Sequence, residues 1–120
     1  MDLQALYSNA VSEYEAGNYE KAHDVFSHLS TAIPAQLEVW KGLAACHQVQ
    51  KNYTQALMTW SIAALLDAND PAPHFHAAEC FVAQGNFFEA RKAVQIALGL
   101  PCSEPFLEQM IRLKEVINNG

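Results

Sequence analysis

The apolar and small residues of this chain recur with a period of 34 positions. When the sequence is aligned on itself at that offset, alanine, asparagine and bulky aromatic residues each return to the same column. The matching columns are Ala10/Ala44/Ala78, Ala22/Ala56/Ala90, Asn18/Asn52/Asn86, Tyr19/Tyr53/Phe87 and the apolar column Phe26/Trp60/Val94. A fixed period of this length indicates a repeat protein whose units stack on their neighbours.

The same pattern predicts seven helices, two in each of three repeats and one after the third repeat. Small residues in the alanine columns should let the paired helices approach closely, and the aromatic column should fill the gap between them. The predicted helices cover about residues 3–16, 19–32, 37–50, 53–67, 71–84, 87–99 and 105–118.

Helix-breaking residues support these boundaries. Gly17 and Gly85 lie where the first helix of a pair should end, with Lys51 at the equivalent middle site, and prolines separate the repeats. The asparagine after each of these sites is predicted to cap the next helix, because its side-chain oxygen can accept an unpaired backbone N–H. In the third repeat Glu89 follows Asn86 by three residues, which is close to a capping box.

The segment after the third repeat predicts a capping helix over residues 105–118, with Pro105 near its start. Its apolar stripe should cover the open end of the third repeat, since terminal repeats need a cap to stay soluble. The stripe consists of Phe106, Leu107, Met110, Ile111, Leu113, Val116 and Ile117. The chain is therefore predicted to be a single all-α domain, with repeats at about 3–36, 37–70 and 71–104.

Composition narrows the class of protein. Of the 120 residues, 51% are hydrophobic and 17% are charged, which is typical of a folded globular domain. The net charge of −6 and the seven Lys and Arg residues argue against a nucleic-acid binder and favour a neutral or basic partner. The sequence has no apolar run of membrane-spanning length and no visible signal peptide. Three widely spaced cysteines favour a reduced compartment, so we expect a cytoplasmic protein.

Candidate catalytic and metal-binding residues are few. His76 and Cys80 would share a helix face, with His74 nearby, but a structural zinc site needs about four ligands. Cys46 and His47 are adjacent on a helix and would point in different directions, so they do not predict a nucleophile and its base. The sequence also lacks a glycine-rich phosphate loop and a nucleophile elbow. We therefore expect no metal, no cofactor and no catalytic site.

The period of 34 residues, with its small and aromatic columns, resembles the tetratricopeptide repeat, a helix–turn–helix unit that stacks into a right-handed solenoid. In that family the first helix of each pair lines a concave surface that binds another chain. Carried over by position, the resemblance implies a peptide-binding face formed by Tyr7, Val11, Tyr14, Lys41, Ala45, Gln48, Val49, Phe75, Glu79 and Val82, with Gln4, Glu15, Glu38, Ala72 and Ala83 beside them.

The residue types on this face predict what it binds. Only Lys41 is basic, so the face lacks the Lys, Arg and Asn cluster with which chaperone-cofactor members of the family hold a C-terminal carboxylate. Several side chains are apolar or aromatic, which suits an extended peptide whose spaced hydrophobic side chains each fill a small pocket. The alternative is that these residues form part of the core and are covered by a neighbouring segment or by a dimer partner.

Two stretches, Trp40–Gln48 and Pro73–Cys80, resemble a narrower family, the class II chaperones of bacterial type III secretion systems. The resemblance spans about residues 5–100. It implies that the concave face binds hydrophobic translocator proteins in the bacterial cytoplasm before secretion, through spaced Pro, Val and Leu anchors. Family members usually carry an additional N-terminal segment, often used for dimerisation, whereas this chain starts almost directly at the first repeat. The sequence therefore leaves open whether the protein forms a homodimer.

Three alternatives also stay open at this point. The solenoid could be a scaffold that docks a folded partner, such as a regulatory protein or a peripheral part of the secretion apparatus at the membrane, on its convex face or final helix. It could be a repeat domain excised from a larger protein, although the start at Met1 and the cap at 105–118 argue against that. An enzyme would need a converging polar pocket that the sequence does not show.

Overall fold

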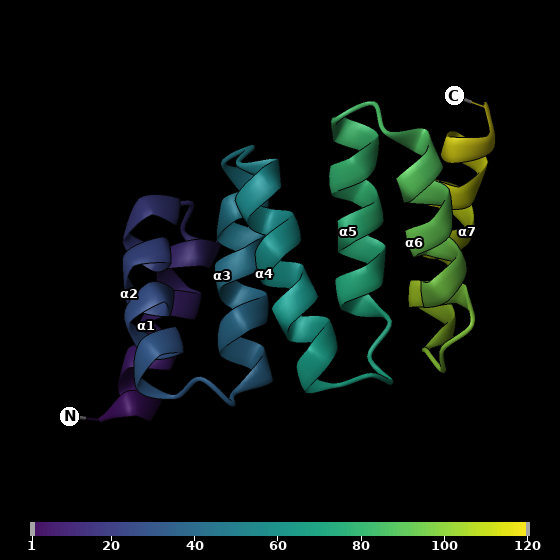
Figure 1. The fold of residues 1–120 in the computed structure, drawn as a ribbon. Coiled ribbons are helices and arrows are strands. Elements are labelled where there is room, and N and C mark those ends of the chain that lie inside the picture. Colours follow the sequence, from purple (N-terminus) through teal and green to yellow (C-terminus); the bar gives the residue numbers. More distant parts are fainter. Residues whose placement is uncertain (1, 120) are drawn as a thin grey trace.

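The computed structural model describes residues 2–119, and within that range the chain forms seven α-helices and no strand. Each helix begins and ends within one residue of the bounds predicted from the sequence. The helices are α1 (Leu3–Glu15), α2 (Tyr19–Ala32), α3 (Leu37–Val49), α4 (Tyr53–Leu66), α5 (Ala72–Ala83), α6 (Phe87–Leu98) and α7 (Glu104–Asn119). Three hairpins, α1/α2, α3/α4 and α5/α6, stack in sequence order and α7 closes the C-terminal end (Figure 1).

The alanine columns lie buried between the paired helices. Ala10, Ala44 and Ala78 in the first helices, and Ala22, Ala56 and Ala90 in the second helices, are all 0% exposed. A methyl side chain at these positions lets the two backbones of a hairpin approach, while larger residues fill the space on either side. In each hairpin the two alanines belong to the same buried cluster, as predicted for residues between the paired helices.

The three turns inside the hairpins share one backbone geometry. Gly17, Lys51 and Gly85 have φ values of 84°, 64° and 74°, the left-handed conformation that ends many helices. The next residue in each turn donates its backbone N–H to a carbonyl five positions earlier, at 2.8 Å in all three cases. These bonds form a Schellman motif in every repeat, and the donor–acceptor pairs are Asn18–Glu13, Asn52–His47 and Asn86–Phe81.

The asparagines do not all cap the second helices as predicted. Asn86 accepts a hydrogen bond from the backbone N–H of Glu89 at 3.3 Å. The side chains of Asn18 and Asn52 accept no such bond, so the prediction is wrong for α2 and α4. Both asparagines are exposed, and water can satisfy the first N–H groups of those helices. The role shared by all three asparagines is the backbone bond that closes the turn.

Helix α7 covers the third repeat, as the sequence predicted. Met110 and Ile117 are fully buried against α5 and α6, and Phe106 and Leu113 pack beside them. Leu107, Ile111 and Val116 belong to the same predicted stripe but stay exposed, because a single helix presents only part of its surface to its neighbours. Within residues 2–119 no helix has both the length and the apolar character needed to cross a membrane.

His47 lies where the first two repeats meet. Its ring contacts the edge of the His23 ring from α2, with 4.9 Å between the ring centres. Burial lowers the pKa of His47 below its usual value of 6.5, and the neighbouring His23 lowers it further. Its Nδ1 is buried and has no hydrogen-bond partner among the described residues. The folded protein therefore favours the neutral form of His47.

This preference predicts a loss of stability in mild acid. The contribution of His47 should be complete above pH 6.5 and should be lost as the pH falls through the lower pKa of the folded state, because the unfolded chain then binds more protons. Urea unfolding at about pH 7.5 and about pH 5.5 measures the loss. His47→Gln should reduce it, whereas His28→Gln, at an exposed site on α2, should not. Equal pH sensitivity of His47→Gln and the unchanged protein would contradict the prediction.

Lys51 predicts a stabilising substitution. It is the one non-glycine residue with positive φ within residues 2–119, and its backbone N–H donates to the Gln48 carbonyl at 3.0 Å. Lys51→Gly should raise the free energy of unfolding by roughly 0.5–1 kcal/mol, because the left-handed strain of about 1–2 kcal/mol exceeds the entropic cost of glycine. The matched control is Gly17→Ala. The added Cβ would have no other atom within 4 Å, so this variant should lose stability only because alanine is strained at a positive φ. Chemical denaturation of both variants tests the pair.

Candidate peptide-binding groove

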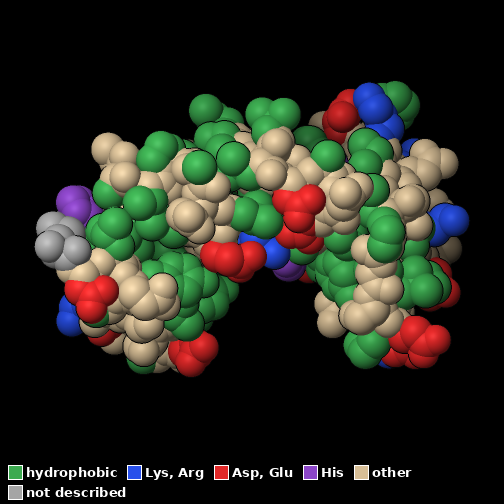
Figure 2. Space-filling model, turned by 90° about the horizontal axis from the view of Figure 1, so that it is seen from below, with side chains coloured by type: hydrophobic (Ala, Val, Ile, Leu, Met, Phe, Trp, Pro, Cys, Tyr) green, Lys and Arg blue, Asp and Glu red, His purple; other side chains and the backbone are tan. Residues whose placement is uncertain are grey.

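The concave side of the solenoid carries a continuous groove built from three adjoining hollows. The first, of about 420 Å³, lies between the start of α1 and the start of α3. The second, of about 300 Å³, shares Tyr7 and Glu38 with it, and the third, of about 460 Å³, shares Tyr14 and Ala45 with the second. Figure 2 shows the surface hollowed between the two ends of the molecule. The groove therefore runs across α1, α3 and α5.

Most of the residues predicted for the peptide-binding face line this groove. They come from the first helix of each hairpin, which is the arrangement that the repeat pattern implied. The predicted residues that line it are Tyr7, Val11, Tyr14, Lys41, Ala45, Gln48, Val49 and Glu79.

Two predicted residues lie elsewhere. Phe75 is only 5% exposed and packs against Ala97 and Met110, with its ring 5.1 Å from that of Phe106. The expectation that Phe75 offers an open contact is therefore wrong, because α7 packs against this part of α5. Val82 packs against the core cluster that joins α5, α6 and α7. The repeat pattern places Phe75 on the concave face of an average unit, and it does not show which residues of the third unit the predicted capping helix covers.

A chain of hydrogen bonds crosses the floor of the third hollow. The indole Nε1–H of Trp60 donates to Gln48 Oε1 at 2.9 Å, and Gln48 Nε2–H donates to Glu79 Oε1 at 3.1 Å. The same carboxylate oxygen lies 2.6 Å from His76 Nδ1. This network connects α3, α4 and α5, so it fixes the second and third repeats to each other beneath the third hollow.

Trp60 and His76 were not among the predicted groove residues. Trp60 belongs to a second helix and to the apolar Phe26/Trp60/Val94 column, which predicted a core position. It is indeed only 3% exposed, yet it lines the third hollow. The indole N–H was the feature of the sequence that could have indicated a polar neighbour for Trp60, since a buried tryptophan usually needs a hydrogen-bond acceptor.

The two junctions between repeats differ at one equivalent pair of positions. At the first junction the Phe26 ring packs directly on Gly42, where any Cβ would overlap the ring. At the second junction the equivalent residues are Trp60 and His76, and their rings stack with 4.7 Å between centres and 22° between planes. The second junction thus has the ring of His76 at the position where the first junction has Gly42, which carries no side chain. His76 therefore forms part of the groove wall.

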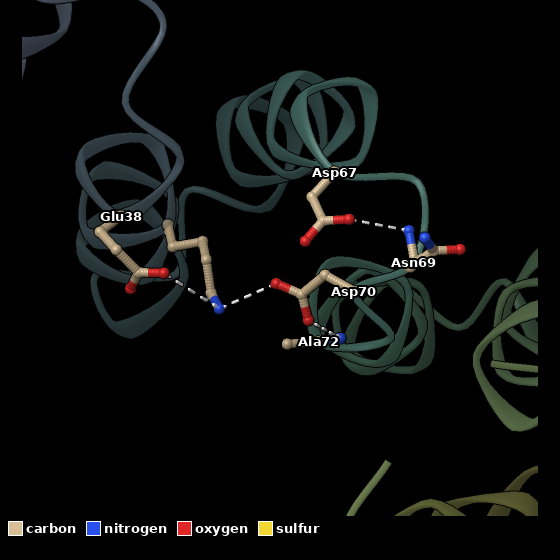
Figure 3. Close-up of polar contacts among 6 residues, drawn as sticks. Glu38, Asp67, Asn69, Asp70 and Ala72 are labelled. Atoms are coloured by element: carbon tan, nitrogen blue, oxygen red, sulfur yellow. Dashed lines mark hydrogen bonds and ion pairs between the residues drawn. The ribbon is translucent and has the colours of Figure 1, made fainter. Parts of the chain in front are cut away.

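Lys41 is held by two carboxylates of the protein. Its Nζ donates to Asp70 Oδ2 at 2.9 Å and lies 3.8 Å from Glu38 Oε1 (Figure 3). The other Asp70 oxygen accepts the backbone N–H of Ala72 at 3.0 Å, which fixes the loop before α5. Because its charge is already matched, Lys41 is poorly suited to hold the carboxylate of a bound chain.

The groove is lined by several carboxylates, and Tyr7 and Tyr14 within it have raised pKa values. Glu15, Glu38 and Glu79 line it, and Lys41 is its one basic lining residue within the described part of the chain. Burial, reinforced by Glu38, raises the pKa of Tyr7 above its usual value, and burial is also the main cause of the raised pKa of Tyr14. These hydroxyls can therefore donate hydrogen bonds near neutral pH.

The residues considered for chemistry have structural roles. Burial raises the pKa of Cys46 to about 11 and that of Cys80 to about 12, so both stay thiols near neutral pH and are poor nucleophiles. His76 faces Glu79 rather than a set of metal ligands. Among residues 2–119, no three His, Cys, Asp or Glu side chains come together in a way that could hold a metal ion.

The hydrogen-bond network predicts a measurable coupling between Gln48 and Trp60. Gln48→Leu should lower the free energy of unfolding by about 1–3 kcal/mol, because it leaves the buried indole N–H without an acceptor. In a Trp60→Phe background the same change should cost clearly less, since the ring no longer carries that donor. A double-mutant cycle by urea unfolding measures the difference. Additive effects would show that the bond does not stabilise the junction.

Comparison with known proteins connects this groove to a family. A tetratricopeptide-repeat model matches residues 37–70, the same range as the second repeat expected from the sequence. The low calcium response locus protein H of Yersinia pseudotuberculosis is 34% identical over 108 residues, which are 90% of this chain and 64% of that protein. The chain thus spans less than two thirds of this curated relative.

Two solved structures have the same fold. The Yersinia enterocolitica type III secretion chaperone SycD, in complex with a peptide of the translocator YopD, has a TM-score of 0.90 and 32% identity, covering 97% of this chain and 92% of that chain. PcrH in complex with the chaperone binding region of PopD has a TM-score of 0.92 and 30% identity, covering 98% of this chain and 91% of that chain. At this identity and coverage the likeness extends beyond the fold to the family.

Proposed function

The chain belongs to the type III secretion translocator chaperones, a family built on tetratricopeptide repeats, and we propose that it binds a hydrophobic translocator protein in its concave groove. The bound segment is extended, and the complex forms in the bacterial cytoplasm before secretion. The chaperone keeps its partner soluble by covering apolar side chains that would otherwise aggregate or insert into a membrane. This role needs binding and no chemical step.

The continuity of the groove is the observation that carries the proposal. Hollows that share Tyr7 and Tyr14 form a track rather than separate pockets. An extended peptide rises about 3.3 Å per residue and points alternate side chains to the same side, so spaced anchors can fill successive hollows. The related SycD and PcrH are described in complexes with a translocator peptide or a chaperone-binding region, which supports the same type of ligand here.

The groove floor is already ordered without a ligand. Hydrogen bonds from Trp60 through Gln48 to Glu79, and the ion pair of Lys41 with Asp70, fix α3, α4 and α5 relative to one another. The entropic cost of binding then falls mainly on the disordered cargo segment. A rigid groove can in this way hold a weakly structured chain through a few buried side chains.

The charge of the groove favours particular cargo segments. Glu15, Glu38 and Glu79 line the groove while Lys41 is paired, so a carboxylate entering it meets repulsion. We infer that the bound segment has apolar anchors and neutral or basic residues between them. The acidic groove also speaks against recognition of an acidic C-terminal tail.

Val49→Glu provides the test of the groove. Val49 lies at the end of α3, lines the third hollow and is 39% exposed, so a carboxylate there leaves the core intact. The protein should be co-expressed with a hydrophobic translocator from the same genome, and the affinity measured by fluorescence anisotropy with a labelled segment of that translocator. We expect at least a tenfold loss of affinity, about 1.4 kcal/mol or more, because an apolar contact is replaced by an unpaired charge.

The matched control is Met58→Glu, which makes the same kind of change on the opposite face, where Met58 is 65% exposed. It should leave the affinity for the segment unchanged, and circular dichroism should stay helical for both variants. Unchanged binding in Val49→Glu would mean that the cargo contacts another face, as expected for a scaffold that docks a folded partner. Failure of the unchanged protein to bind the translocator at all would overturn the proposed function itself.

A further inference from the structure

Glu79 gives the third hollow of the groove a negative charge. Among the described residues that line this hollow, Glu79 is the only carboxylate, and none is Lys or Arg. At an offset of 34 residues its counterparts are Val11 and Ala45, which also line the groove. The position therefore faces the groove in all three repeats but carries a charge only in the third. Stacking of the repeats does not require a carboxylate there.

The hydrogen bonds around Glu79 have a fixed direction. The indole of Trp60 can only donate, so the amide oxygen of Gln48 faces it and the amide nitrogen of Gln48 faces the carboxylate. Gln48 Nε2, at 3.1 Å, and His76 Nδ1, at 2.6 Å, lie against the same oxygen, Glu79 Oε1. A glutamine could accept both bonds through its own side-chain oxygen. The network thus explains an acceptor at this place and leaves the negative charge unexplained.

The second oxygen of this carboxylate is available to a ligand. Within residues 2–119, Glu79 Oε2 takes part in no hydrogen bond, and the only ionisable partner of Glu79 is His76. The Glu79 side chain is 36% exposed. Lys41, which lines the adjoining second hollow, is already paired with Asp70 at 2.9 Å. The charge of Glu79 is therefore not matched by any Lys or Arg of the described chain.

Aromatic rings line the same hollow. Tyr14 and Tyr53 are half-buried and lie there together with Trp60. The face of such a ring attracts a cation, and a partly desolvated carboxylate beside it attracts the cation further. The alkyl stem of a long basic side chain can at the same time pack on Val49 and Ala83. The hollow thus combines the three kinds of contact that a Lys or Arg side chain needs.

We propose that the third hollow is a cation subsite in which Glu79 pairs with a Lys or Arg side chain of the bound cargo segment. This inference rests on the proposed function, since it assigns one part of the groove to one type of cargo residue. The first and second hollows, which include Leu3, Ile33 and Val11, take the hydrophobic anchors. Glu79 then contributes specificity, because a segment with an acidic or apolar residue at this place leaves the carboxylate repelled or unpaired.

Glu79→Gln tests the subsite, because it removes the charge and keeps an oxygen that can accept the bonds from Gln48 and His76. Its affinity for the labelled translocator segment is measured by fluorescence anisotropy. We expect a loss of about tenfold, the effect of one charge-assisted hydrogen bond. The matched control is Glu115→Gln, the same change at an exposed site on α7, which should leave the affinity unchanged.

The cargo residue is identified with variants of the same segment in which each Lys and Arg is replaced in turn by Met. One replacement should cost about tenfold with the unchanged protein and close to nothing more with Glu79→Gln, which defines the pair in a double-mutant cycle. Equal binding of that segment variant by both proteins also shows that Glu79→Gln is folded.

The outcomes separate the subsite from the groove. Additive losses in the cycle, tight binding of a segment that contains no Lys or Arg, or unchanged affinity in Glu79→Gln would each overturn the cation subsite. In the last case, loss of binding by Val49→Glu would show that the proposed function still holds. Failure of the unchanged protein to bind the translocator would instead overturn the proposed function, and the subsite with it.

Discussion

The close approach of paired helices at six buried alanines is the constraint on which the rest of the structure depends. Ala10, Ala44 and Ala78 face the second helices, and Ala22, Ala56 and Ala90 face the first helices, all with 0% exposure. With methyl side chains at these positions, the large buried rings of Phe26 and Trp60 lie at the junctions between hairpins. The junctions then decide the shape of the concave side. A larger residue in these columns would disturb the groove as well as the core.

The two junctions use the same positions in different ways. Phe26 against Gly42 gives a dense apolar contact, whereas Trp60 against His76 gives a stacked pair linked to Gln48 and Glu79 by hydrogen bonds. The first junction contributes apolar surface to the groove, and the second contributes polar groups. A ligand that lies across both would meet two chemical environments within one track. The two parts of the groove therefore differ in chemistry although the fold repeats.

Much of the architecture could be predicted from the sequence, because it follows from local rules. The alanine columns and the left-handed turns at Gly17 and Gly85 fix the helix boundaries within one residue. The misses in the groove involve residues whose environment depends on distant parts of the chain. Phe75 is covered by α7, and Trp60 reaches the groove from a second helix. Position within a repeat cannot reveal either effect, since it carries no information about what lies beyond the neighbouring unit.

The contacts within this solenoid run almost entirely between helices that are adjacent in the sequence. Folding therefore requires few long loops to close, and proteins of such low contact order reach their native state quickly. Folding of such an array can begin at any hairpin and spread to its neighbours, and the groove appears only when neighbouring hairpins dock, because the shared hollows lie at the junctions. A solenoid with this topology can therefore complete its groove soon after its own synthesis.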